Sequence, residues 1–194
     1  MRALYQQAID QHRHRVYSFA QYSLRVREDA EDVTQEVFIK LWQHWRKVDH
    51  AKLSAWLMRV AHNAVIDHVR KQRPQQANLD RYAEVEEQAA EQTEESRRDQ
   101  DVFKRHLQAA IRELNDPFRS IVIMRDIQGM SYEEIQGSLE LSASQVKVYL
   151  HRARRKLRED KELRQLFEEQ IADNSNTNKP VLVAGREEGN RHAK

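Results

Sequence analysis

Hydrophobic residues recur at helical spacing in the first third of the chain and predict three helices. The first helix carries the stripe Val16, Phe19, Ala20 and Leu24. The second, over 29–45, carries Ala30, Val33, Val37, Leu41 and Trp45. In the third, Ser54 is the expected N-cap of a helix whose apolar face is Leu57, Val60, Ala61, Ala64 and Val65. This segment is therefore expected to be a small helical bundle.

A different pattern marks the region around residues 131–159. Ser131 to Glu134 and Ser142 to Gln145 both have the spacing of a capping box. They predict a short helix over about 131–138, a tight turn at 139–141 and a long basic helix after it, which is the order of a helix-turn-helix motif. Pro117 suits the first turn of an earlier helix capped by Asn115 or Asp116.

Composition supports an all-α protein. The 194 residues include only four glycines and three prolines, too few for the turns of β-sandwiches, barrels or glycine-rich nucleotide-binding loops. The absence of cysteine excludes disulfides, thiolate metal sites and cysteine nucleophiles. No apolar run approaches the roughly 18 residues of a membrane span, and we expect a cytoplasmic protein without membrane insertion.

Charge divides the chain into two domains. Between Asp80 and Asp101 nine acidic residues face three basic ones, and the run follows Pro74, where a helix should stop. We predict two small helical domains, 1–73 and 101–172, joined by a flexible or loosely helical acidic linker over 74–100. The tail 173–194 is predicted to be disordered.

The last predicted helix has two contrasting faces when projected at 100° per residue. Its apolar side comprises Val146, Leu150, Ala153 and Leu157. The other side is polar and basic, with Ser144, Gln145, Lys147, Val148, His151, Arg152 and Arg155. Such a face suits a recognition helix, whose first residues reach base edges while later arginines hold phosphates. A solvated basic face on an amphipathic helix is the alternative.

These segments resemble the extracytoplasmic-function sigma factors, the small two-domain group of the sigma-70 superfamily. Gly129 to Ile135 (GMSYEEI) and Leu141 to Arg154 (LSASQVKVYLHRAR) are similar to their region 4. Independently, Asp29 to Trp42 (DAEDVTQEVFIKLW) and Ser54 to Asp67 (SAWLMRVAHNAVID) are similar to two helices of their region 2. The resemblance covers roughly residues 4–73 and 103–160, in the order of the family.

The resemblance implies a subunit that binds core RNA polymerase, through the clamp helices of β′ and through β, and directs it to promoter DNA. Matched residue by residue, polymerase binding falls on Asp32, Gln35, Glu36, Phe38 and Trp42. Phe38 and Trp42 lie off the stripe of Val33 and Val37 and would serve as aromatic anchors. Alternatively, these two rings belong to a broad helical core.

In the family, an unstacked base of the minus-10 element is captured by a loop and the polar face of the helix that follows. The resemblance assigns that role to Arg46, Lys47, Val48, Arg59, Asn63 and Arg70. The loop over 45–53 lacks the central aromatic residue and glycines common in the family. In the recognition helix, Gln145 and Val148 stand where many relatives have threonine and serine, so we expect a different minus-35 element.

Two other classes of function are weighed against this interpretation. A stand-alone helix-turn-helix regulator would need a receiver, ligand pocket or dimer helix, which 1–73 does not offer. A non-DNA adaptor would not need the basic recognition face. The nine histidines have no zinc-site spacing and no nucleophile–base pair stands out, so we expect neither a metal, a cofactor nor enzymatic activity. An anti-sigma factor is an expected partner, and the free chain is expected to be monomeric.

Overall fold

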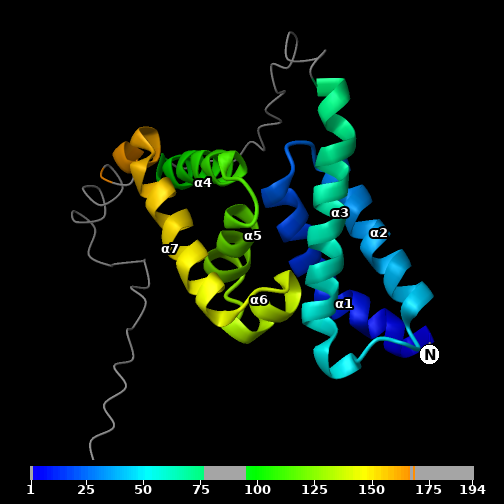
Figure 1. The fold of residues 1–194 in the computed structure, drawn as a ribbon. Coiled ribbons are helices and arrows are strands. Elements are labelled where there is room, and N and C mark those ends of the chain that lie inside the picture. Colours follow the sequence, from blue (N-terminus) through cyan, green and yellow to red (C-terminus); the bar gives the residue numbers. More distant parts are fainter. Residues whose placement is uncertain (1, 77–94, 167, 169–194) are drawn as a thin grey trace, which may run out of the picture.

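The computed structural model describes residues 2–76, 95–166 and 168, and within them it contains helices and no strand (Figure 1). Three long helices form the first half: α1 (Arg2–Ser23), α2 (Arg27–His44) and α3 (Leu53–Gln76). A single 3₁₀ turn, η1 (His50–Lys52), leads directly into α3. We call α1–α3 the N-terminal half.

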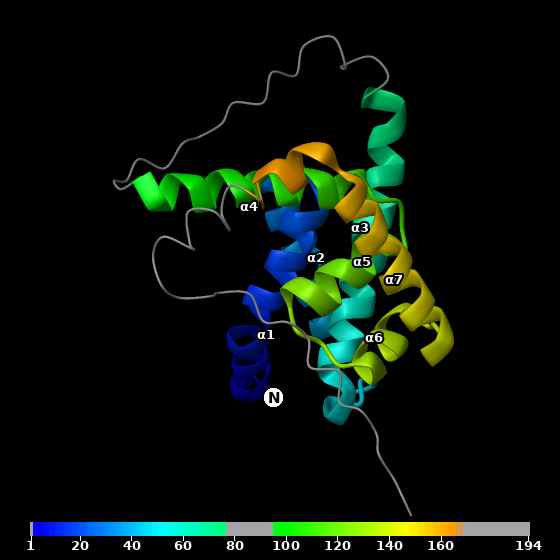
Figure 2. The same ribbon diagram turned by 90° about the vertical axis from the view of Figure 1, so that its left-hand side faces the viewer.

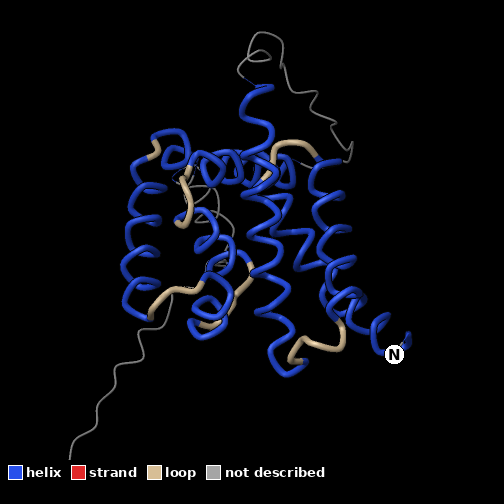
Figure 3. The backbone as a smooth tube through the Cα atoms, turned by 45° about the vertical axis from the view of Figure 1, so that its right-hand side comes forward, coloured by secondary structure: helices blue, strands red, loops and turns tan. Residues whose placement is uncertain are grey.

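The C-terminal half begins with α4 (Glu95–Glu113) and α5 (Phe118–Val122), which continues into a π-helical turn, η2 (Ile123–Ile127). Two further helices, α6 (Tyr132–Leu139) and α7 (Ala143–Glu159), form the predicted helix-turn-helix. The loops between the described helices are short (Figure 3). The two halves pack against each other, with α6 on α3 and with α4, α5 and η2 on α1 (Figures 1 and 2).

The predicted apolar stripes form the cores. Phe19 of α1, Leu41 of α2 and Leu57 of α3 are completely or almost completely buried in the N-terminal half. Ile111, Ile121, Met124, Ile135 and Leu150 are equally buried in the C-terminal half. The all-α fold class is thereby confirmed, and the buried side chains of the two halves join in one hydrophobic core.

Helix termini depart from the predictions in three places. Ser54 does not cap α3. Asp49 instead starts η1 by accepting a hydrogen bond from the Ala51 amide at 3.0 Å, and η1 supplies the first turn. The Ser54 hydroxyl accepts from Arg15 Nη1 at 3.0 Å, so its acceptor is used by another helix.

The other two helix termini that depart from the predictions lie near prolines. α3 continues to Gln76, two residues beyond Pro74, so the proline does not end the helix. Pro117 occupies the N-cap of α5 rather than its first turn, and no side chain caps that helix. The Asp116 carboxylate accepts instead from the Ser120 hydroxyl.

The predicted linker over 74–100 is helical at both of its described ends, since α3 runs to Gln76 and α4 begins at Glu95. Residues 77–94 and the predicted tail over 173–194 lie outside the described residues. Within the described part of the chain, no helix combines the length and the apolar character required to cross a membrane.

Candidate nucleic-acid and polymerase interfaces

The helix-turn-helix is fixed by two complete capping boxes. The Ser131 hydroxyl accepts from the Glu134 amide at 3.1 Å, while the Glu134 carboxylate accepts from the Ser131 amide at 2.8 Å. The same reciprocal pair joins Ser142 and Gln145 at the start of α7. Between the helices Glu140 adopts the left-handed conformation, with φ of 56°, and reverses the chain. The turn therefore sets the angle at which α7 leaves α6.

α7 presents the predicted recognition face to solvent. Val146, Leu150 and Ala153 are buried against the rest of the half. All seven residues predicted for the minus-35 element are exposed: Ser144, Gln145, Lys147, Val148, His151, Arg152 and Arg155. Val148 keeps 45% of its surface exposed although it is apolar. Tyr149 is half-buried and meets Phe118 edge to face at 5.6 Å between centroids, so its ring belongs to packing.

The side chain of Gln145 takes part in the cap of α7 and also has a donor on the exposed face of the helix. Its side-chain Oε1 accepts from the Ser142 amide at 2.8 Å, which orients the group at the helix start. Its NH₂ group has no such role in the capping box and remains a donor on the exposed face. Arg154, outside the predicted set, is held in the fold because its Nε donates to the Asp126 carboxylate at 3.0 Å.

The residues predicted for the minus-10 element come from the loop before α3 and from one face of α3. Arg46, Lys47, Asn63 and Arg70 are exposed, and Arg59, Asn63 and Arg70 lie within about 40° of one another over 11 residues, about 16 Å along α3. Val48 is only 8% exposed because its side chain joins the core at the end of α2. In this conformation the side chain of Val48 is not accessible to DNA, and its role as a DNA contact stays a prediction.

Arg59 is occupied by the C-terminal half. Its Nη2 and Nε donate to the Gly137 carbonyl at 2.6 and 3.2 Å, and its Nη1 lies 2.9 Å from the Glu140 carboxylate. Nearby, the Ser138 hydroxyl donates to the Ala55 carbonyl at 3.3 Å. The end of α6 thus covers part of the α3 face, an arrangement that sequence reasoning missed.

Two more polar contacts close this interface. Gln128 donates to the Arg15 carbonyl at 2.8 Å. His62 Nε2 of α3 lies 3.6 Å from the Asp116 carboxylate, and both side chains are about one-fifth exposed. Burial acts to raise the pKa of Asp116, but the nearby His62 ring, the hydrogen bond from Ser120 and the charge of Arg119 outweigh it, so the pKa is lowered.

The predicted polymerase face on α2 is exposed except for one residue. Asp32, Gln35, Glu36 and Trp42 face solvent, whereas Phe38 is only 6% exposed. Phe38 packs in the core, which favours the alternative of a broad helical core for this ring; its role as an aromatic anchor stays a prediction. Its carbonyl accepts from the Tyr5 hydroxyl at 2.9 Å.

Trp42 lies beside an exposed apolar residue, Ile39, that was not predicted from the sequence. Trp42 is 49% exposed and Ile39 is 50% exposed, and Tyr5 meets the Trp42 ring edge to face at 4.9 Å. At 100° per residue, Gln35, Ile39 and Trp42 point within about 60° of one another. The position of Ile39 off the buried stripe of α2 was the signal that could have identified it.

Family models match both halves. The model of sigma-70 region 2 matches residues 8–75, and that of sigma-70 region 4 matches residues 104–157. The RNA polymerase sigma factor CarQ of Myxococcus xanthus is 30% identical over 149 residues, which cover 76% of this chain and 83% of CarQ. The chain belongs to the sigma-70 family, in its extracytoplasmic-function group. It is a sigma factor, a protein of the class that directs transcription from promoters.

Other relatives of this sigma factor belong to the same group. SigM of Bacillus subtilis is 29% identical, and the match covers 74% of this chain and 86% of SigM. SigE of Mycolicibacterium smegmatis is 32% identical over 78% of this chain, which spans 59% of the length of SigE.

Solved structures share the fold of the sigma factor. CnrH, determined in complex with the cytosolic domain of CnrY, superposes with a TM-score of 0.60 at 21% identity, covering 89% of this chain and 91% of CnrH. RpoE of Bartonella quintana was determined in complex with the anti-sigma factor NepR. It superposes with a TM-score of 0.61 at 22% identity, covering 79% of this chain and 94% of RpoE. The region 2 fold is the N-terminal half and the region 4 fold is the C-terminal half.

Among the described residues of the sigma factor, no group of three or more His, Asp or Glu side chains is placed to hold a metal ion.

Proposed function

We propose that this sigma factor binds core RNA polymerase and recognises a minus-35 element through α7 and a minus-10 element through the face of α3 and the loop before it. The observation that carries the proposal is the face of α7, where polar, basic and one apolar residue are exposed opposite a buried apolar stripe. A helix of this kind fits the major groove.

Residues at the start of α7 are proposed to contact bases, and residues further along the helix are proposed to contact phosphates. Gln145 lies in the first turn, where its free NH₂ group can donate to a base edge, and Val148 offers a methyl surface to thymine. Arg152 and Arg155 follow one and two turns later, where phosphates are the natural acceptors. Sequence preference should therefore depend on the start of α7, and general affinity on its later turns.

The residues proposed to contact the minus-10 element are Arg46, Lys47, Arg59, Asn63 and Arg70. Asn63 is exposed in the middle of α3 and can recognise a base edge, while the basic residues hold the backbone. Unstacking a base costs a few kcal/mol, which contacts in the pocket must offset. In the closed arrangement Arg59 is held by Gly137 and Glu140, and separation of the two halves would release it for the backbone.

Polymerase binding is proposed for the exposed face of α2, through the clamp helices of β′, with β as a further contact. Trp42 and Ile39 provide an apolar centre, and Asp32, Gln35 and Glu36 provide polar neighbours. An aromatic anchor surrounded by polar groups is typical of the residues that dominate binding energy at interfaces.

An anti-sigma factor is proposed as a further partner, because the solved RpoE relative is a complex with an anti-sigma factor and CnrH is a complex with CnrY. We place this sigma factor in the cytoplasm as a monomer, acting as a specificity subunit without a cofactor or a catalytic role of its own.

The proposal is tested by co-purifying the full chain with core polymerase and then measuring run-off transcription from a promoter library. Transcripts that start at defined promoters only when the chain is present support it. Failure to associate with core, or binding to operators without polymerase, contradicts it.

A further inference from the structure

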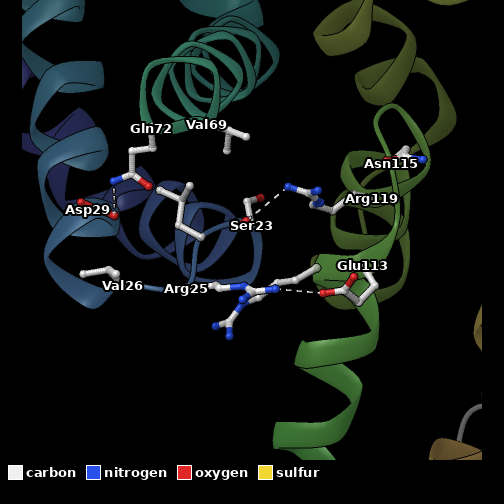
Figure 4. A pocket seen from close by; sticks show the side chains of 11 residues that line it. Ser23, Arg25, Val26, Asp29, Val69, Gln72, Glu113, Asn115 and Arg119 are labelled. Atoms are coloured by element: carbon white, nitrogen blue, oxygen red, sulfur yellow. Dashed lines mark hydrogen bonds and ion pairs between the residues drawn. The ribbon is translucent and has the colours of Figure 1, made fainter. Parts of the chain in front are cut away.

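A polar hollow of about 350 Å³ lies between the two halves (Figure 4). The N-terminal half contributes the end of α1, the start of α2 and two residues of α3. The C-terminal half contributes the end of α4, the loop after it and Arg119 of α5. The hollow exists only while the halves are together, because neither half encloses it alone.

Two arginines of the C-terminal half are held in place here by the end of α1. Arg112 Nη2 donates to the Gln21 carbonyl at 3.2 Å. Arg119 Nη1 donates to the Ser23 carbonyl at 3.4 Å (Figure 4). The last carbonyls of a helix have no partners within it, and they carry its negative partial charge. These contacts fix the guanidinium groups while leaving further N–H donors of each unused.

Positive charge around the hollow is incompletely matched. Glu113 pairs with Arg25 at 3.1 Å, and the Asp29 carboxylate accepts from Gln72 at 2.9 Å and lies 3.1 Å from His68. Arg112 and Arg119 form no ion pair with a carboxylate of the described residues.

The guanidinium group of Arg112 is affected by the positive charges that surround it. Burial and the charges of Arg25 and Arg119 lower the pKa of its guanidinium. Its Nε atom is buried and has no hydrogen-bond partner. A buried donor without an acceptor costs free energy, so this guanidinium is incompletely satisfied in the closed arrangement.

The start of α2 adds donors at the rim. Val26 is the N-cap and provides no side-chain cap, so the first amides of this 18-residue helix have no side-chain acceptor from that position. Glu28 and Asp29 in the first turn offset part of the positive end of the helix. The arginines remain the main determinants of the site.

We propose that this hollow binds a small phosphate-bearing anion, and that the bound anion holds the two halves together. Its volume is within the range of small-molecule sites, and guanidinium groups match phosphate oxygens in geometry and charge. An anion that binds only the closed arrangement stabilises it by mass action. Because closure occupies Arg59, the anion would also oppose promoter binding; this consequence rests on the proposed function, whereas the site itself does not.

The test uses the full chain and two probes, inorganic pyrophosphate and a nucleoside triphosphate, at constant ionic strength in chloride. Calorimetric titration measures binding. The chain has no cysteine, so Gln43→Cys with Glu133→Cys, both at exposed positions in opposite halves, allows a fluorescent pair to report closure. Neither readout requires polymerase or DNA, so failure here is distinguishable from failure of the proposed sigma function.

We expect saturable binding of at least one probe with increased energy transfer. Tighter binding of the triphosphate would assign a nucleotide, and equal binding would assign the inorganic group. Arg112→Gln, and separately Arg119→Gln, should weaken binding by about tenfold or more, as expected for loss of a charge-assisted hydrogen bond. Arg27→Gln, which removes an exposed arginine paired with Glu31, is the matched control and should bind normally. Absence of saturable binding, equal loss in the control, or binding without closure would overturn the proposal.

Discussion

Arg59 of α3 donates two hydrogen bonds to the carbonyl oxygen of Gly137, at 2.6 and 3.2 Å, and so joins the face of α3 proposed for the minus-10 element to the last turn of α6. In the closed arrangement this guanidinium contacts both Gly137 and Glu140, which leaves fewer of its N–H donors for a DNA phosphate. Promoter binding and the closed arrangement therefore compete for one side chain.

Replacing Arg59 with alanine should open the isolated chain. The variant loses both hydrogen bonds to Gly137 and the ion pair with Glu140, so the two halves are expected to separate more often. Small-angle scattering should show a larger radius of gyration. Arg70→Ala, on the same helix but paired only with Asp67 of its own half, should leave the radius unchanged. Equal expansion in both variants would contradict the role given to Arg59.

Replacing Gln35 and Glu36 together with alanine should reduce association with core polymerase by about tenfold or more if this face of α2 is the contact. Both side chains are exposed, so the free energy of unfolding should change by about 0.5 kcal/mol or less. Co-purification and a thermal melt measure the two effects. Asp10→Ala with Gln11→Ala, an exposed polar pair on α1, is the control. Normal association of the α2 double variant would refute the assignment.

Substitutions along α7 should separate sequence recognition from general affinity. Gln145→Ala is expected to change preference at one minus-35 base pair by about 1–3 kcal/mol, and Val148→Ser to act similarly at a thymine. Arg155→Ala should weaken all promoters nearly uniformly. Gln145→Ala also removes half of a capping box, so Ser142→Ala, which disrupts the same box, controls for the loss of helix stability. If Gln145→Ala and Arg155→Ala both weaken all promoters to the same extent, this face positions DNA without recognising its sequence.

Acid should weaken the fold through Asp116, whose pKa is lowered below its ordinary value of 3.8. A depressed carboxyl pKa contributes stability that is present above the unfolded value and is lost as the pH falls through the folded value. Asp116→Asn should therefore cost about 1–2 kcal/mol near neutral pH and less at about pH 3. Urea unfolding of both proteins at the two pH values measures this. A difference that is the same at both would exclude ionisation of Asp116 as the cause.

The features predicted from sequence are those set by local patterns. The buried stripes of α1, α2 and α3 follow from helical spacing, and both capping boxes follow from residue type at fixed separation. The exposed face of α7 follows from the same projection. In each case neighbours in sequence decide the outcome.

The features that were missed depend on contacts distant in sequence. Nothing near Arg59 indicates that its acceptor is 78 residues away. Val48 and Phe38 are apolar residues at the edge of a helical stripe, and only the packing of other helices decides whether such residues are buried. Ser54 has the chemistry of an N-cap, yet Arg15 of another helix uses its hydroxyl.

Free protein and holoenzyme should differ sharply in DNA binding. In the free chain Arg59 is occupied and each half has only a small DNA face, whereas polymerase would hold the two halves at the spacing of a promoter and raise their effective concentration. Gel shifts of the isolated chain on promoter duplex should show weak binding. Nanomolar, sequence-specific binding by the chain alone would contradict this account.

The most direct measurement is transcription by core polymerase from a library randomised across the minus-35 and minus-10 elements, with the chain present and absent. We predict defined start sites only when the chain is present, enrichment of one sequence at each element, and a shift confined to one minus-35 base pair when Gln145→Ala replaces the wild type. Initiation that is independent of the chain, or that shows no preference at either element, would contradict the central claim that this protein gives polymerase its promoter specificity.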